Sequence, residues 1–421
     1  MNWREIEQIP LLLYVIKWLI ASCMVGLLVG SASAILLLSL NWATHYRDTH
    51  TSIILFLPLA GLVIGLLYYY WGRGSVKGNN LLIDEINHPS QKVPFRMAPL
   101  VYIGTVLTHL FGGSAGREGT AVQMGGAISD TLSHFMRFKK RDRRIMLLIG
   151  VSAGFASVFG TPLAGAIFAL EVLIIGRVRY EALLPSFLAA FFAHYTCHSL
   201  WQVSHATYAI GEIPRLTPLS LLLVIGVGIL FGLTALLFSK LAHFWTLLSV
   251  RLIAYAPFRP LLGGVILVLV IGLMGSTEYI GLGIPTIVSS FTTQHEWYGF
   301  LVKLVLTTFT LGVGFKGGEV TPLFFIGATL GSALSGIIPL PIGLLAGMGF
   351  VAVFAGATNT PIACVFMGIE LFGAEAGLYL AIACVTAYFF SGHTGIYSSQ
   401  TIGSPKHLLY GLTKGKKLNE L

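Results

Sequence analysis

Long apolar stretches recur along almost the whole chain, separated only by short polar segments. The nine recognisable stretches are Leu11–Leu40, Ile53–Trp71, Ala98–Phe111, Ile145–Ile175, Ala182–Trp201, Leu219–Leu248, Leu261–Met274, Phe300–Phe315 and Gly343–Phe372. Several exceed the ~20 residues that a helix needs to cross a bilayer, and others are short or interrupted. With 55% hydrophobic and 10% charged residues, the chain cannot bury this apolar surface in one aqueous core. The sequence predicts an all-α membrane protein with at least nine helices.

Positively charged residues gather in two segments, "RFKKRDRR" at Arg137–Arg144 and "KGKK" near the C-terminus. The net charge of +9 is explained by the excess of Lys and Arg that is typical of cytoplasmic loops, so we expect no nucleic-acid partner. The first ten residues mix both charge signs and lead into an apolar run, which indicates a retained first helix and not a cleaved signal. We expect a multi-pass protein of the inner (plasma) membrane, with the lipid bilayer as its partner.

The four cysteines are scattered through apolar segments. Cys23, Cys197, Cys364 and Cys384 show neither the spacing of a metal site nor that of a disulfide framework. We interpret them as packing residues and expect no metal and no cofactor.

The chain also contains two related halves. "GREGTAVQMGGA", which starts at Gly116, and "GGEVTPLFFIGA", which starts at Gly317, align without gaps and share five of twelve residues. A second pair follows in the same order: "TPLAGAIFALEV" from Thr161 and "TPIACVFMGIEL" from Thr360. Internal repeats are typical of secondary transporters, whose substrate site lies between the repeats. The sequence predicts an N-terminal repeat over 1–205, a C-terminal repeat over 206–403 and a short basic cytoplasmic tail over 404–421.

Both copies of the first segment contain the signals of a helix that begins inside the membrane. Glycines at 112, 113, 116 and 119 interrupt the first apolar run, and Pro322 suits the first turn of a helix in the second copy. The first N–H groups of such a helix lack intrahelical partners, so an anion or an internal acceptor must satisfy them. We expect an anion to bind where the two helix starts converge, and the Glu118 carboxylate to replace it when no anion is bound.

These residues resemble the CLC family of anion channels and anion/proton exchangers. The resemblance rests on "GGSA" before "GREGT", on "GGEVTP", on the two "TP" blocks and on "GIYSSQ", and it covers roughly residues 15–400. It implies a CLC-like fold of two inverted-topology repeats with broken and re-entrant helices. It also implies a homodimer with one anion pathway per subunit, and a gating role for Glu118.

Four departures are similar to the fluoride/proton antiporter branch of that family. Asn79 stands where chloride-handling members have an anion-coordinating serine, and Val172 stands where many exchangers have a second acid. Thr120 replaces the usual proline of "GREGP", and Glu319 replaces an apolar residue. The resemblance therefore implies that fluoride is exported in exchange for protons.

The resemblance also implies a set of site residues. Glu118 and Glu319 would control gating and proton coupling. Fluoride holds its water tightly and needs strong, close hydrogen-bond donors. The expected anion-binding residues are Asn79, Tyr397, Gly119, Val320 and Thr321.

Arg117, beside Glu118, is expected to hold backbone carbonyls or an acid, because an arginine within a membrane usually needs such a partner. Glu171 and Glu370 lie at the ends of apolar stretches and are interpreted as structural acids. The sequence thus separates the acids proposed for transport from those that hold the fold together.

Two alternatives remain at this point. The first is a chloride channel or chloride/proton exchanger of the same family, against which Asn79 and Glu319 argue. The second is an intramembrane serine hydrolase, because the G-x-S-x-G pattern occurs around Ser114 and Ser152. A hydrolase also needs a histidine base and a strand before the serine. With 49 glycines in the chain, so short a match is expected by chance, and we predict that the protein is not an enzyme.

Overall fold

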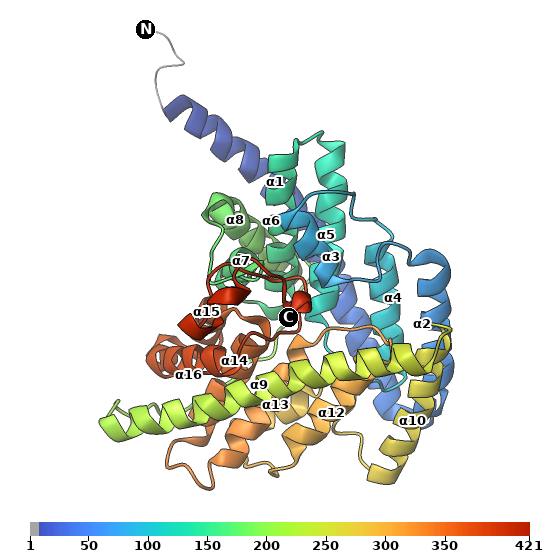
Figure 1. Cartoon of the computed structure of the whole chain (residues 1–421), viewed down its shortest axis with the longest axis vertical. Coiled ribbons are helices and arrows are strands. Elements are labelled where there is room, and N and C mark those ends of the chain that lie inside the picture. Colours follow the sequence, from blue (N-terminus) through green and yellow to red (C-terminus); the bar gives the residue numbers. More distant parts are fainter. Residues whose placement is uncertain (1–7) are drawn as a thin grey trace.

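The computed structural model describes residues 8–421 and shows an almost entirely helical protein (Figure 1). The helices of the first half are α1 (Gln8–Thr49), α2 (Leu57–Trp71), α3 (Asn79–Asn87), α4 (Met97–Leu110), α5 (Glu118–Phe135), α6 (Lys140–Phe159), α7 (Pro162–Glu171) and α8 (Leu183–Tyr195). Those of the second half are α9 (Pro218–Leu252), α10 (Phe258–Met274), α11 (Ile284–Ser289), α12 (Gly299–Gly312), α13 (Val320–Leu334), α14 (Ile342–Thr358), α15 (Pro361–Phe372) and α16 (Gly377–Phe390).

Short elements connect these helices. They are the 3₁₀ turns Thr51–Phe56, Tyr180–Ala182, Ala374–Ala376, Leu408–Thr413 and Leu418–Glu420, the π turn Thr196–Leu200, and the strands β1 (Ile174–Ile175) and β2 (Thr401–Ile402). The strands pair in parallel, so the segment after α7 lies beside the segment after α16. Within residues 8–421, three segments are long and apolar enough to cross a membrane: Ile9–Thr49, Thr51–Trp71 and Pro218–Leu252. Most other apolar helices are shorter, as expected for broken and re-entrant segments.

Two long apolar stretches of the sequence are each divided into two helices. In the first, α6 ends at Phe159, Gly160 follows in the left-handed region with φ 76°, and α7 begins at Pro162. In the second, Asn359 with φ 60° separates α14 from α15, which begins at Pro361. Proline suits a first helical turn because its missing N–H would have no partner there. The prediction that nine stretches are a lower limit on the number of helices is confirmed.

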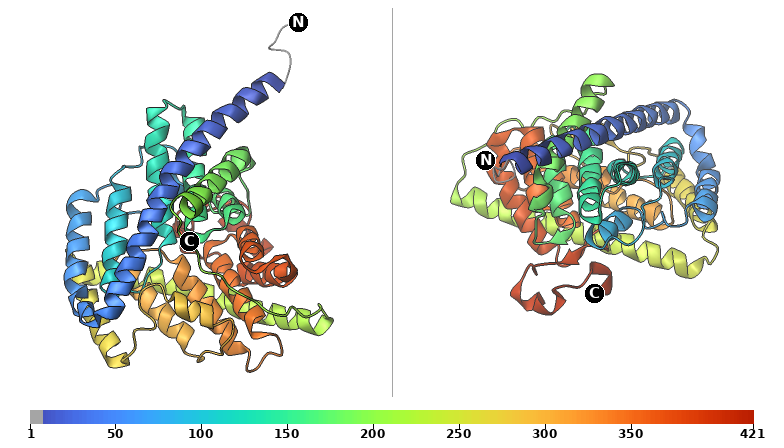
Figure 2. Two further views of the ribbon diagram at one scale, coloured as in Figure 1. Left: turned by 180° about the vertical axis from the view of Figure 1, so that it is seen from behind. Right: turned by 90° about the horizontal axis from the view of Figure 1, so that it is seen from above.

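The two halves repeat the same packing. The longest helices, α1 and α9, run obliquely across the others, with α1 against α6 and α8 and α9 against α14 and α16 (Figure 2). Helices α5 and α6 approach so closely that a Cβ added to Gly125 would lie 2.2 Å from the Gly150 carbonyl oxygen. In the second half, a Cβ on Gly327 would lie 2.0 Å from the Gly349 oxygen. Glycine is therefore required at both contacts, as is common between membrane helices.

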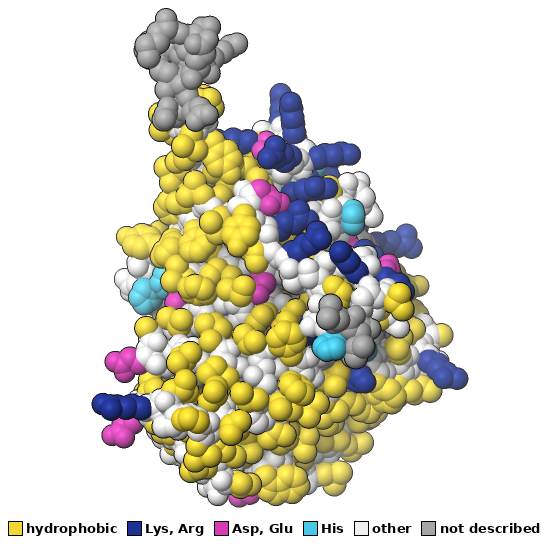
Figure 3. Space-filling view, turned by 60° about the vertical axis from the view of Figure 1, so that its left-hand side comes forward, with side chains coloured by type: hydrophobic (Ala, Val, Ile, Leu, Met, Phe, Trp, Pro, Cys, Tyr) yellow, Lys and Arg dark blue, Asp and Glu magenta, His cyan; other side chains and the backbone are white. Residues whose placement is uncertain are grey.

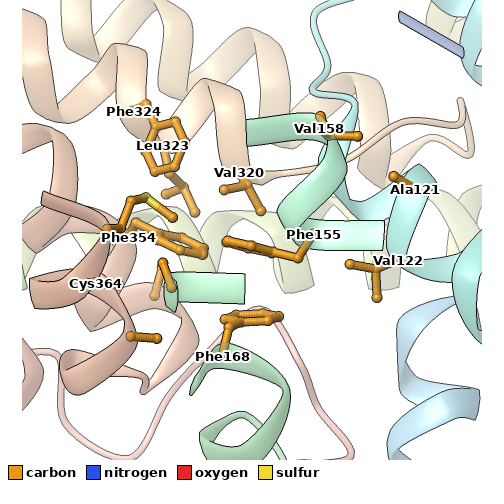
Figure 4. Close-up of a cluster of buried hydrophobic side chains, with 14 of the residues drawn as sticks. Ala121, Val122, Phe155, Val158, Phe168, Val320, Leu323, Phe324, Phe354 and Cys364 are labelled. Carbon is orange, nitrogen blue, oxygen red and sulfur yellow. The ribbon is translucent and has the colours of Figure 1, made fainter. Parts of the chain in front are cut away.

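One hydrophobic core joins the halves beside the starts of α5 and α13 (Figure 4). Phe155 and Phe168 of the first half stack with ring centroids 4.4 Å apart, and Phe354 of the second half lies 6.0 Å from Phe168. Phe324, on the first turns of α13, packs on the same cluster with its centroid 5.3 Å from that of Phe354. Close-packed aromatic rings resist displacement, so this core holds the two helix starts in fixed relative positions.

The last residues fold back onto α3. The Lys417 ammonium lies 2.6 Å from an Asp84 carboxylate oxygen, and the Leu418 N–H donates to the Gln400 carbonyl at 3.0 Å. Burial alone would raise the pKa of Asp84, but the hydrogen bond and charge of Lys417 outweigh it and lower that pKa. The tail is therefore tied to the helix that carries Asn79.

Candidate functional site

The two repeat-related loops meet through a pair of glycines. The Gly116 N–H donates to the Gly318 carbonyl at 2.6 Å, and the Gly318 N–H donates back to Gly116 at 2.7 Å. A Cβ on Gly318 would lie 2.7 Å from the Gly119 nitrogen, so only glycine fits there. The alignment of the repeats matched Gly116 with Gly317, whereas in the structure Gly116 pairs with Gly318. This contact brings the starts of α5 and α13 together.

Glu118 is the first residue of α5, and its carboxylate lies on the start of α13. One oxygen accepts hydrogen bonds from the N–H groups of Thr321 at 3.0 Å and Arg117 at 3.1 Å. The other accepts the Thr321 hydroxyl at 2.5 Å and lies 3.6 Å from Arg117 Nε. The side chain of Glu118 is buried. The acid of the first repeat thus occupies the free N-terminus of a helix in the second, a position that suits an anion.

Glu319 faces a different cavity, of about 150 Å³, together with Asn79 and Tyr397. A Cβ placed on Gly119 would lie 3.1 Å from Asn79 Nδ2 and 3.5 Å from Glu319 Oε2. Because Gly119 has no side chain, Asn79 Nδ2 and Glu319 Oε2 can both lie close to the start of α5. Asn79 Oδ1 is buried and has no hydrogen-bond partner among residues 8–421.

Glu118 borders a second, smaller cavity of about 20 Å³, which it lines with Arg117, Thr321, His205 and Tyr208. This is space for about one water molecule. Within the described part of the chain, no residue lines both cavities. Glu118 and Thr321 thus border the smaller cavity, whereas Glu319 borders the larger one.

Asn79 and Tyr397 are far apart in sequence and lie close together because the segment after Tyr397 is bonded to α3. Asn79 begins α3 after Gly78, which has φ 55°. The next residue, Asn80, accepts the N–H of Ser399 at 2.9 Å through its side chain. The Tyr397 ring packs edge-on against Phe168 at 6.5 Å. The structure therefore brings the predicted residues Asn79, Glu319 and Tyr397 to one cavity, and Gly119, Val320 and Thr321 to the adjoining helix starts.

Glu171 and Glu370 cap each other's repeat-related helices. The Glu171 carboxylate accepts the N–H groups of Ile362 at 3.1 Å and Ala363 at 2.8 Å, at the start of α15. The Glu370 carboxylate accepts the N–H groups of Leu163 and Ala164 at 2.9 and 2.8 Å, at the start of α7. Each acid satisfies donors that have no intrahelical partner, which agrees with the structural interpretation.

Two further residues of the larger cavity were not singled out from the sequence. Lys316 lies just before "GGEVTP", and its ammonium sits 4.2 Å from the centre of the Tyr68 ring. Gln123 follows Glu118 on α5 and lines the same cavity. Lys316 could have been found from the sequence, because a cation next to a predicted helix break within the membrane indicates a functional residue. Gln123 carried no such signal, because a lone glutamine has no specific pattern.

The serine-hydrolase alternative finds no support in the geometry. The Ser114 hydroxyl donates to the Tyr279 carbonyl at 3.0 Å and lies 2.9 Å from the Thr307 hydroxyl. The Ser152 hydroxyl, within α6, donates to the Ser186 carbonyl at 2.8 Å. Among residues 8–421, neither hydroxyl is hydrogen-bonded to a histidine, and neither serine lies on a strand-to-helix turn, which the hydrolase motif requires.

The fold and the site are those of a membrane transport protein built from two repeats, with interrupted helices that meet at a site able to hold an anion. Comparison with known proteins agrees. A family model described as voltage gated chloride channel matches residues 60–392. The chain therefore belongs to the voltage gated chloride channel, or CLC, family, whose members are channels and transporters.

Individual relatives make the likeness more specific. The chain is 53% identical over 412 residues to a protein of Pseudomonas syringae pv. tomato named chloride/fluoride channel protein, covering 96% of this chain and 91% of the relative. A solved structure titled as a CLC-type fluoride/proton antiporter is 38% identical, with a TM-score of 0.89 over 91% of this chain and 97% of that one. A slow cyanobacterial Cl⁻/H⁺ antiporter shares the fold, with a TM-score of 0.77 and 21% identity over 89% and 94% of the two chains. The predicted family and fold are confirmed.

Proposed function

We propose that this protein exports fluoride from the cell in exchange for protons that enter. One observation carries the proposal. The Glu118 carboxylate occupies the N-terminus of α13 and accepts both the N–H and the hydroxyl of Thr321. A helix N-terminus binds anions, so a fluoride ion and this carboxylate compete for the same donors.

The exchange follows from that competition. Protonation of Glu118 removes its charge and weakens its hold on Thr321, since hydrogen bonds to a charged acceptor are stronger than those to a neutral one. The neutral side chain then leaves the helix start, and fluoride takes the donors of Val320 and Thr321. The Asn79 Nδ2 group and the Tyr397 hydroxyl donate further hydrogen bonds to the anion from the larger cavity. Glu319 takes up and releases protons there. Glu118 then releases its proton toward the cytoplasm, and the ionised carboxylate returns to the Thr321 donors and displaces the anion toward the outside.

The more similar of the two solved structures favours fluoride over chloride: the 38% identical one is titled as a fluoride/proton antiporter. The name of the Pseudomonas syringae relative includes both chloride and fluoride. Chloride is also named for relatives of lower identity, such as the 26% identical H(+)/Cl(-) exchange transporter of Yersinia pseudotuberculosis and the 21% identical solved structure. Asn79 in the larger cavity offers an amide donor where chloride-handling members have a serine.

The test is an efflux assay in liposomes that contain purified protein and are loaded with fluoride or with chloride. A fluoride-selective or chloride-selective electrode and a pH electrode record anion efflux and proton uptake together. We expect fluoride to leave much faster than chloride and to be accompanied by proton uptake. Equal rates for the two anions would favour a chloride transporter, and fluoride efflux without proton movement would favour a channel.

We further propose a homodimer in the inner membrane with both termini in the cytoplasm. Residues 1–205 and 206–403 would form the two repeats of each subunit, and residues 404–421 the cytoplasmic tail. Cross-linking in native membranes should yield a dimer. A Lys416→Cys variant should react with an impermeant maleimide only after the cells are permeabilised. Labelling in intact cells would place the tail outside.

A further inference from the structure

A basic hollow lies at the charged end of the molecule, away from the two cavities of the transport site. It has a volume of about 460 Å³ and is formed by the end of α3, the start of α6 and the segment before α8. Its apolar walls are Ile86, Ile145 and Leu148, and its charged residues are Lys140, Arg141, Arg144, Arg179 and Glu181. Four cations thus face one acid.

The charges around this hollow are not balanced among the residues that the structure describes, 8–421. Glu181 is paired with Arg179 at 3.1 Å, and the neighbouring Asp142 is paired with Lys17 at 2.8 Å. Within residues 8–421, no salt bridge involves Lys140, Arg141 or Arg144. The hollow therefore carries an excess of positive charge that an anion can neutralise.

The two innermost guanidinium groups are already oriented. Arg144 Nη2 donates to the Asn87 carbonyl and Arg179 Nη2 to the Asn87 side-chain oxygen, both at 3.2 Å. These hydrogen bonds hold both guanidinium groups in place, so an acceptor that enters the hollow meets donors that are already oriented.

The surroundings indicate what kind of anion fits. Tyr180, Leu183 and Leu184, in the turn before α8 and at its start, are exposed to 73, 41 and 40% and form an apolar surface beside the hollow. Figure 3 shows Lys and Arg side chains gathered toward the upper end of the molecule, above a broad apolar surface. The hollow thus lies where a charged cytoplasmic face meets the apolar surface.

We propose that this hollow binds the headgroup of an anionic phospholipid from the cytoplasmic leaflet. The phosphate would accept hydrogen bonds from Arg144 and Arg179, because guanidinium groups match the geometry of phosphate oxygens. Lys140 and Arg141 would add charge at the rim, and the acyl chains would follow the apolar surface of α8. Basic pockets between membrane helices on the cytoplasmic side are suited to such headgroups. Inorganic phosphate is also negatively charged, but it has no acyl chains that could pack against the apolar residues of the hollow.

The test is native mass spectrometry of the purified full-length protein. Phosphatidylglycerol and phosphatidylcholine with identical acyl chains are titrated separately, and inorganic phosphate is added as a competitor. We expect the wild type to retain phosphatidylglycerol in preference to phosphatidylcholine. In Lys140→Gln/Arg141→Gln, each removed cation should weaken phosphatidylglycerol binding about fivefold, and Arg144→Gln should weaken it further. Lys139→Gln, an exposed neighbour that does not line the hollow, is the matched control and should behave as wild type.

Three results would overturn the proposal. They are equal retention of the two lipids by the wild type, unchanged binding in Lys140→Gln/Arg141→Gln, and displacement of the lipid by inorganic phosphate at equimolar concentration. Lys140 and Arg141 are exposed and form no salt bridge within residues 8–421, so their replacement should leave the fold intact even if Arg144→Gln fails to fold. Because the readout is lipid retention, failure here is distinguishable from failure of the proposed transport.

Discussion

Replacement of Glu118 by glutamine should tighten the binding of fluoride. The carboxylate accepts two hydrogen bonds from Thr321, through its N–H at 3.0 Å and its hydroxyl at 2.5 Å. A hydrogen bond to a charged group contributes about 1.5–3 kcal/mol, and one between neutral groups about 0.5–1.5 kcal/mol, so each bond loses about 1 kcal/mol in the variant. The competitor for the helix start is then weaker by about 2 kcal/mol, which corresponds to about a 30-fold change in an equilibrium constant.

Isothermal titration of fluoride into purified protein measures this change. At neutral pH we expect the Kd of Glu118→Gln to fall by up to about 30-fold relative to wild type. Glu370→Gln is the matched control, because Glu370 is also an acid bound to a helix start, that of α7, but it lines neither cavity. Its fluoride affinity should not change. Equal or weaker fluoride binding by Glu118→Gln would refute the view that this carboxylate and the anion compete for the same donors.

Three further predictions address selectivity, coupling and stability. Asn79→Ser should narrow the difference between fluoride and chloride efflux rates, because a hydroxyl replaces the amide donor that faces Gly119; an unchanged ratio would remove Asn79 from the selectivity site. Glu319→Gln should strongly reduce proton uptake per fluoride in the liposome assay, whereas Val172→Ala should leave that ratio intact, and the reverse pattern would assign proton transfer to the region of Val172. Glu370→Ala should lower the free energy of unfolding by about 2–3 kcal/mol, because two N–H groups at the start of α7 lose their acceptor; an unchanged thermal unfolding temperature would show that this cap is not needed.

Local features of the sequence were sufficient to predict the starts of α5 and α13. Glycine and proline act on their own neighbours, so "GREGT" and "GGEVTP" predicted helix starts before any contact was known. The helix starts at Pro162 and Pro361 were not predicted, because each lies inside one continuous apolar stretch. The repeat then predicted that two such starts converge, and Glu118 and Thr321 do meet. The positive φ values of Gly160 and Asn359, which end α6 and α14, were seen only in the structure.

Contacts between distant segments could not be predicted from such local signals. Glu171 and Glu370 were interpreted correctly as structural acids, but their caps join residues 191 to 207 positions apart, and nothing near either acid indicates the partner. Asn79 was proposed as a site residue only through the resemblance to the CLC family, because its placement depends on the Asn80–Ser399 bond. The pairing of Gly116 with Gly318 instead of Gly317 likewise depends on how the two loops approach each other.

The most direct test of the central claim records fluoride efflux and proton uptake simultaneously from liposomes that contain either wild-type protein or Glu118→Gln. A glutamine cannot take up and release the proton that the carboxylate exchanges, so the account predicts coupled fluxes in the wild type and no proton-coupled fluoride transport in the variant. If Glu118→Gln keeps both fluxes at the wild-type ratio, then Glu118 is a structural acid, and the proposed competition between its carboxylate and fluoride does not drive transport.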